Sequence, residues 1–131
     1  MPYDSTQMGR LTFNMYGAVN TSTTSNASVM CPLPNYRPDI FVGNDPGNFV
    51  VTVYNRHPSV TLSCTLYRLG TSGNAVGSAT ASTPLSPFNT NAQTLVWSLP
   101  TNTAQYSYAL ECSIPPATGF GMSHVTSVYY D

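Results

Sequence analysis

The sequence contains no lysine and few charged residues of any kind. Charged side chains make up 7% of its 131 residues, whereas they make up about a quarter of an average globular domain. The cations are Arg10, Arg37, Arg56 and Arg68, and the formal net charge at pH 7 is −1. Four dispersed arginines cannot neutralise a run of phosphates or hold an anionic bilayer. We therefore expect neither a nucleic acid nor a membrane surface as a partner.

Long apolar runs are also missing. No stretch approaches the roughly 20 apolar residues that a membrane-spanning helix needs. No window shows an apolar stripe at helical spacing, because Pro, Gly, Thr and Val interrupt every candidate. Hydrophobic residues nevertheless make up 41% of the chain and aromatic residues 11%, which favours a packed core over disorder. We expect a flexible segment at residues 1–10 and a single domain at residues 11–131.

Two neighbouring segments alternate between apolar and polar residues. Residues 48–55 and residues 60–67 both show the period of two that is typical of half-buried strands. The short connection at residues 56–59 predicts that the two strands form a hairpin in which Val51 faces Cys64. With this register the apolar residues of both strands fall on one face.

A second hairpin is predicted from residues 95–99 and 106–110, which would place Trp97 in the core opposite Tyr108 and turn Cys112 inward. Further strands are expected at residues 11–16, 28–33, 75–81 and 122–130. About eight strands without a helix predict an all-β fold, an antiparallel two-sheet β-sandwich with a jelly-roll or immunoglobulin-like arrangement. A closed barrel is the alternative architecture.

The three cysteines are too far apart for a structural zinc site, which would use a close pair of cysteines or nearby histidines. One disulfide with one remaining thiol is the natural interpretation. We expect Cys64 to pair with Cys112, because both lie at inward positions of predicted strands, whereas Cys31 ends its strand against Pro32. Three reduced, buried cysteines are the alternative. A disulfide in a lysine-free, Ser- and Thr-rich chain indicates a secreted, extracellular protein.

No catalytic constellation is apparent. His57 lies in a predicted turn, and His124 follows Ser123 in a predicted strand, where neighbouring side chains point to opposite faces. Glu111 alternates outward as a solvated carboxylate. Residues 37–48 gather oxygen ligands of the kind that suit calcium, but they first fit a turn. We expect no enzyme activity, no metal and no cofactor, and an enzyme that uses Glu111 or His124 is the least favoured alternative.

Outward tyrosines are the positive indication of function. Tyr54 and Tyr67 face outward on the first predicted hairpin, and Tyr129 and Tyr130 end the last predicted strand. Flat aromatic rings with a hydroxyl can bind sugar rings or another subunit. Cross-strand packing on a half-exposed sheet would also explain them.

Three segments resemble a group of uncharacterised secreted bacterial proteins with C-P-x-P, H-P-S-x-x-x-S-C-T-L and E-C-S-I-P-P motifs. Here the segments are residues 31–34, 57–66 and 111–116. The resemblance implies export and a β fold, and it supplies no activity and no catalytic residues. Members of the group often carry a further cysteine near the mature N-terminus, which residues 1–10 lack, so the resemblance does not assign the disulfide.

These observations predict a non-catalytic secreted domain that binds a glycan or a cell-surface ligand through Tyr54, Tyr67, Tyr129 and Tyr130. The alternative is a structural subunit of an extracellular assembly or filament. In that homo-oligomer, low charge and exposed tyrosines would serve self-association, and an unpaired cysteine would link neighbours.

Overall fold

The computed structural model describes residues 11–14, 17–33, 48–70, 72–98 and 107–130. The predicted flexible segment 1–10 lies outside these residues. Within the described ranges no helix is long and apolar enough to span a membrane. The strands are β1 (Leu11–Asn14), β2 (Gly17–Asn20), β3 (Ala27–Leu33), β4 (Asn48–Tyr54), β5 (Ser63–Leu69), β6 (Ala75–Ser82), β7 (Gln93–Ser98), β8 (Ser107–Ile114) and β9 (His124–Tyr130).

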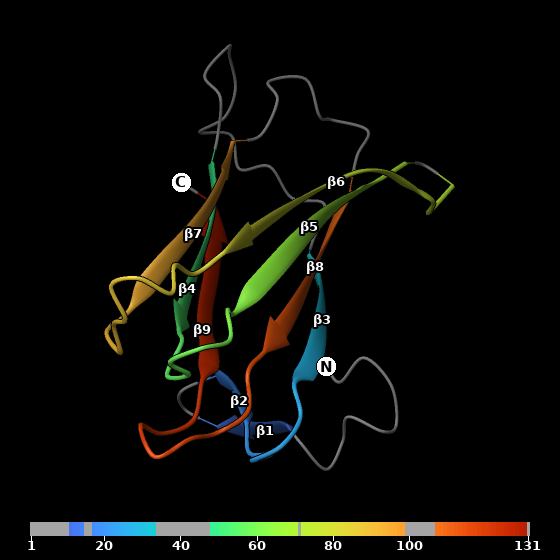
Figure 1. Ribbon diagram of the computed structural model, residues 1–131. Coiled ribbons are helices and arrows are strands. Elements are labelled where there is room, and N and C mark those ends of the chain that lie inside the picture. Colours follow the sequence, from blue (N-terminus) through green and yellow to red (C-terminus); the bar gives the residue numbers. More distant parts are fainter. Residues whose placement is uncertain (1–10, 15–16, 34–47, 71, 99–106, 131) are drawn as a thin grey trace.

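These strands form two antiparallel sheets that face each other, so the predicted β-sandwich is confirmed (Figure 1). One sheet has the order β1-β2-β9-β4-β7, and the other has the order β3-β8-β5-β6. The pairs are nested in sequence, because β5 pairs with β6, β4 with β7, β3 with β8 and β2 with β9. Nested pairs of this kind arise when one long antiparallel hairpin of paired strands is wrapped into two sheets. The result is the jelly-roll arrangement, here with β1 added at one edge.

Each predicted strand overlaps an observed one, but β2 is too short for a period of two to reveal it. Both predicted hairpins are wrong. The structure places β4 and β5 in different sheets, and β7 and β8 also lie in different sheets. The partners of Val51 are Leu95 on β7 and Val128 on β9. The alternation of apolar and polar residues determines which side chains face the core, but it does not determine which strands are hydrogen-bonded to each other. Two strands that face each other across the sandwich show the same alternation as two paired strands.

The core lies between the sheets and contains buried side chains from both layers. Phe49 and Trp97, which are partners in the β4–β7 ladder, have ring centroids 5.8 Å apart. Cys64 and Cys112 are direct partners in the β5–β8 ladder and form the predicted disulfide, which is confirmed. Cys31 is a free, half-buried cysteine packed against this core. The disulfide fits an oxidising compartment.

Candidate functional site

The described tyrosines from the predicted binding set do not share one surface. Tyr54 ends β4, whereas Tyr129 pairs with Val50, about 13 Å further along that strand. Tyr67 lies in the other sheet, where its hydroxyl donates a hydrogen bond to Glu111 Oε2 at 3.1 Å. The side chain of Tyr130 lies outside the described part of the structure.

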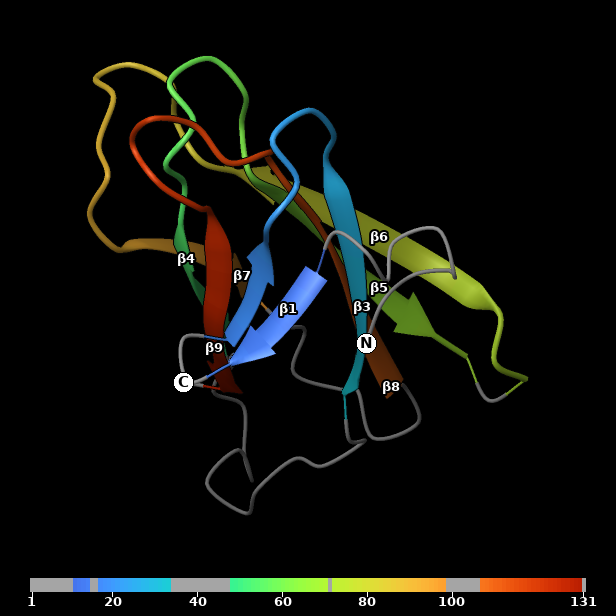
Figure 2. The ribbon, with the colours of Figure 1, turned by 90° about the horizontal axis from the view of Figure 1, so that it is seen from below.

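Four loops meet at one end of the sandwich, which we call the loop end (Figures 1 and 2). They comprise residues 21–26, 55–62, 83–92 and 115–123, and each connects a strand of one sheet to a strand of the other. Backbone hydrogen bonds join them in pairs. Ala117 N donates to Ser22 O at 2.7 Å, and Thr83 N donates to Leu62 O at 2.9 Å. Thr118 Oγ1 donates to Arg56 O at 3.1 Å and links the two pairs, so the four loops are one connected layer.

A buried asparagine organises the loop at residues 55–62. The Asn55 side-chain nitrogen donates to Val60 O at 2.9 Å and to Thr83 Oγ1 at 2.8 Å, and its oxygen accepts from His57 N at 2.9 Å. The ring Nδ1 of His57 accepts from Ser59 N at 3.1 Å and from Val60 N at 3.0 Å. His57 thus closes a turn with its ring, as the sequence predicts from its position.

Exposed apolar side chains gather in two of these loops. Phe88 and Phe120 form an edge-to-face pair with ring centroids 5.2 Å apart, and Phe120 is 57% exposed. Leu85 precedes Phe88 in its loop, and Met122 follows Phe120; both are exposed. We call Leu85, Phe88, Phe120 and Met122 the loop-end surface. Large exposed apolar clusters on a soluble domain mark interaction sites.

Sequence reasoning missed the loop-end surface because it follows no period and joins two loops that are distant in the chain. One local signal was present. Phe120 is flanked by Gly119 and Gly121, so its ring has no neighbouring side chain on the chain to pack against. Gly121 has φ +115°, and a Cβ there would lie 3.0 Å from Arg56 Cδ. Its backbone conformation favours glycine, and any larger residue would also have to displace Arg56 slightly.

A cluster of three side chains lies beside the loop-end surface. The rings of Tyr54 and His124 are parallel within 21° and 4.5 Å apart, and Arg56 Cζ lies 5.8 Å from the centroid of the Tyr54 ring. His124 Nδ1 donates to Met122 O at 3.3 Å. Burial lowers the pKa of His124 below its usual 6.5; the Met122 hydrogen bond opposes this shift, and the charge of Arg56 adds to it.

The lowered pKa of His124 predicts a loss of stability in mild acid. As the pH falls below 6.5, the unfolded histidine takes up a proton that the folded one still excludes, so the free energy of unfolding decreases. Urea denaturation at pH 7.5 and pH 5.0 should show this loss in the wild type and a smaller loss in His124→Gln. Equal losses in the two proteins would contradict the assignment to His124.

The described residues offer little to a catalyst. No group of three His, Cys, Asp or Glu side chains among them could hold a metal ion. Ser123 is buried, and its hydroxyl accepts a hydrogen bond from Arg56 N at 2.8 Å. The loop end thus presents an apolar, aromatic surface with the half-buried guanidinium of Arg56 at its side.

Comparison with known proteins gives a likeness in fold. No protein-family model matches the sequence, and no curated protein matches it. Among solved structures, the chain is similar to the enzymatically active domain of tailspike protein 4 from bacteriophage CBA120, with a TM-score of 0.51 and 18% sequence identity. The match covers 93% of this chain and 17% of that one. At this identity the likeness shows the β-sandwich fold alone.

Proposed function

We propose that the chain is a non-catalytic extracellular domain that binds a glycan of a cell surface at the loop end. The observation that carries the proposal is the exposed pair Phe88 and Phe120, held on a connected layer of loops. Sugar rings present apolar C–H faces that stack on aromatic rings. Phe has no hydrogen-bonding group, so water does not stabilise its exposed ring, and an exposed pair of such rings calls for a partner. The likeness to part of a tailspike domain concerns the fold, and a fold hosts many functions.

Tyr54 and Arg56 extend the proposed site. Tyr54 and Arg56 are half-buried neighbours at the same end, so the Tyr54 hydroxyl and the Arg56 guanidinium can add hydrogen bonds to sugar hydroxyls. Of the three predicted tyrosines whose side chains the structure describes, Tyr54 is therefore the one that fits this site. The disulfide in the core supports a role outside the cytoplasm.

Phe120→Ala should weaken glycan binding about tenfold, because it removes the most exposed ring of the loop-end surface. The measurement is a glycan array with wild-type protein, followed by calorimetric titration of the best glycan. Tyr129→Ala is the matched control, since Tyr129 is 47% exposed on the outer face of a sheet away from the loop end. Absence of any array signal would sink the proposal, and so would a loss of affinity in Tyr129→Ala alone.

A second candidate function is a structural subunit of an extracellular assembly. The observation that favours it is a row across β7, β4 and β9, in which Val50 pairs with Val96 on one side and Tyr129 on the other. Val96 is 52% exposed at one end of this row, and Tyr129 is exposed at the other. Sedimentation of the wild type over a wide concentration range separates the candidates, because a monomer at all concentrations excludes self-association.

A further inference from the structure

The backbone of Arg56 is tied to the loop that carries Phe120. Arg56 N donates to Ser123 Oγ at 2.8 Å, and Arg56 O accepts from Thr118 Oγ1 at 3.1 Å. These two partners lie on either side of Phe120 in the segment 115–123. Hydrogen bonds therefore fix the backbone position of Arg56 relative to that of Phe120.

The side chain of Arg56 follows the same loop. A Cβ at Gly121 would lie 3.0 Å from Arg56 Cδ and 3.7 Å from Nη1, so the stem and the guanidinium both lie close to the residue after Phe120. Arg56 is half-buried, and a long cationic side chain of this kind buries its stem while its charged head stays in water. The guanidinium thus lies at the edge of the loop-end surface.

No carboxylate of the described residues neutralises this guanidinium. The acid that these residues include is Glu111, which alternates with buried residues on β8 and so points to the outer face of its sheet. There its carboxylate accepts a hydrogen bond from the Tyr67 hydroxyl. Arg56 Cζ lies 5.8 Å from the centroid of the Tyr54 ring, and a cation–π contact leaves the positive charge in place. The described part of the loop end therefore combines exposed aromatic rings with one uncompensated positive charge.

A ligand that uses both features has an apolar face for the rings and an anionic group beside that face. Sugar acids have this form, because their carboxylate is attached directly to the sugar ring, next to the C–H groups that stack on aromatic side chains. The two oxygens of a carboxylate match the parallel N–H groups of a guanidinium, and the charges on both partners strengthen the hydrogen bonds. One guanidinium also matches one singly charged group.

We propose that the glycan bound at the loop end is acidic, with a sugar carboxylate paired to Arg56 while the ring of the same sugar stacks on Phe120. This rests on the glycan-binding function proposed above, and it adds the class of glycan that the site selects. The aromatic pair contributes affinity for neutral and acidic sugars alike. Arg56 distinguishes between them.

Glycans in matched pairs separate this proposal from the one on which it rests. The probes are oligosaccharides of glucuronic, galacturonic and sialic acid on an array, each beside its carboxyl methyl ester, which has the same ring without the charge. The wild type should bind acids about tenfold more tightly than their esters. Esters that bind as tightly as the acids would overturn the acidic class and leave glycan binding intact, whereas a silent array would overturn both.

Salt provides a test that needs no variant. Sodium chloride should weaken the binding of the best acid, because part of the attraction is between charges, and it should leave the binding of the ester nearly unchanged. Calorimetric titration at 20 mM and 500 mM sodium chloride, both roughly chosen to lie on either side of physiological ionic strength, gives the comparison. Equal affinities for the acid at the two concentrations would contradict pairing with a guanidinium.

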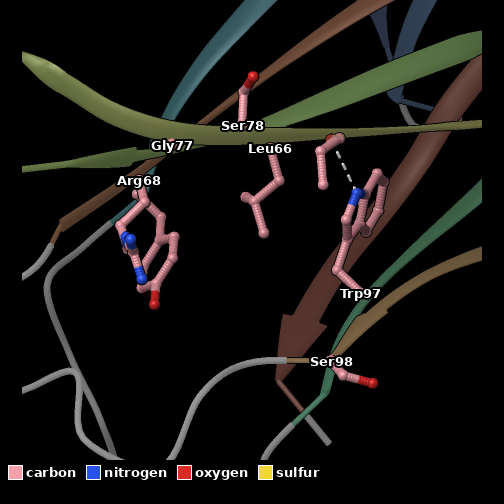
Figure 3. A pocket seen from close by; sticks show the side chains of 8 residues that line it. Leu66, Arg68, Gly77, Ser78, Trp97 and Ser98 are labelled. Carbon is pink, nitrogen blue, oxygen red and sulfur yellow. Dashed lines mark hydrogen bonds between the residues drawn. The ribbon is translucent and has the colours of Figure 1, made fainter.

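Arg56→Gln should lower the affinity for the best acid about tenfold and leave that for its ester unchanged. Phe120→Ala should instead weaken both ligands by the same factor. The matched control is Arg68→Gln, because Arg68 lies near the far end of β5, where it lines a pocket with Leu66 and Trp97 away from the loop end (Figure 3). Circular dichroism establishes that each variant is folded. Unchanged binding of the acid by folded Arg56→Gln, or an equal loss for acid and ester, would refute the role of Arg56.

Discussion

Replacing both Cys64 and Cys112 with alanine should lower the free energy of unfolding by about 4 kcal/mol. The disulfide closes a loop with a sequence separation of 48, and the loss of chain entropy in the unfolded state gives this magnitude for such a loop. The disulfide is also fully buried, and both of its cysteines belong to the core cluster between the sheets. Urea denaturation followed by the fluorescence of Trp97 measures the change.

Cys31→Ala is the matched control for that experiment. Cys31 is half-buried and belongs to no disulfide, so its replacement should cost less than about 1 kcal/mol. Thiol titration of the unfolded, unreduced wild type should find one thiol per chain, and Cys31→Ala should show none. Equal destabilisation by the control and the double variant would mean that the disulfide contributes no stability of its own.

The pairing of these cysteines could be predicted because it depends on local information. Alternation along a strand determines the face on which each side chain lies, so Cys64 and Cys112 are inward whichever strands are neighbours. The same reasoning correctly placed Phe49, Val51 and Trp97 in the core. It failed for strand pairing, since Val51 faces the layer that contains Cys64 without being its ladder partner.

The candidate site could not be predicted in the same way. Phe88 lies in the loop between β6 and β7, and Phe120 lies in the loop between β8 and β9, so the two loops are neighbours only once both connections have crossed between the sheets. Loop positions carry no periodic pattern, so an exposed ring there is indistinguishable in sequence from a buried one. Tyr54 was found because it ends an alternating strand, and the structure adds that His124 stacks on it.

Arg68 shows the limit of assigning charged residues to the surface. Arg68 lies two and four residues from Leu66 and Cys64 on β5, so the three side chains project from the same, inward face of the strand. A charged side chain, however, is ordinarily expected to face solvent. Arg68 is only half-buried, and it lines a pocket next to its ladder partner Gly77.

Asn20→Ala should lower the free energy of unfolding by about 3 kcal/mol. Asn20 is fully buried, and its side-chain nitrogen donates to Ser25 O at 3.0 Å, to Ile114 O at 2.8 Å and to Pro115 O at 3.0 Å. Its side-chain oxygen accepts from Ser22 N at 2.9 Å. Truncation leaves these buried backbone groups without a partner, at about 1–3 kcal/mol for each group that water cannot reach.

Asn20→Asp separates hydrogen bonding from packing, because aspartate keeps the shape of asparagine and loses the donor. It would place a carboxylate against three carbonyl oxygens, so at pH 7 it should destabilise the protein more than Asn20→Ala does. Thr23→Ala, an exposed position in the same loop, should change stability by less than about 0.5 kcal/mol. Urea denaturation of the three variants provides the measurement, and an Asn20→Asp protein as stable as the wild type would contradict the role of the donor. Because Asn20 joins the loop at residues 21–26 to the segment that leads to Phe120, the two Asn20 variants should also weaken glycan binding at the loop end, whereas Thr23→Ala should not.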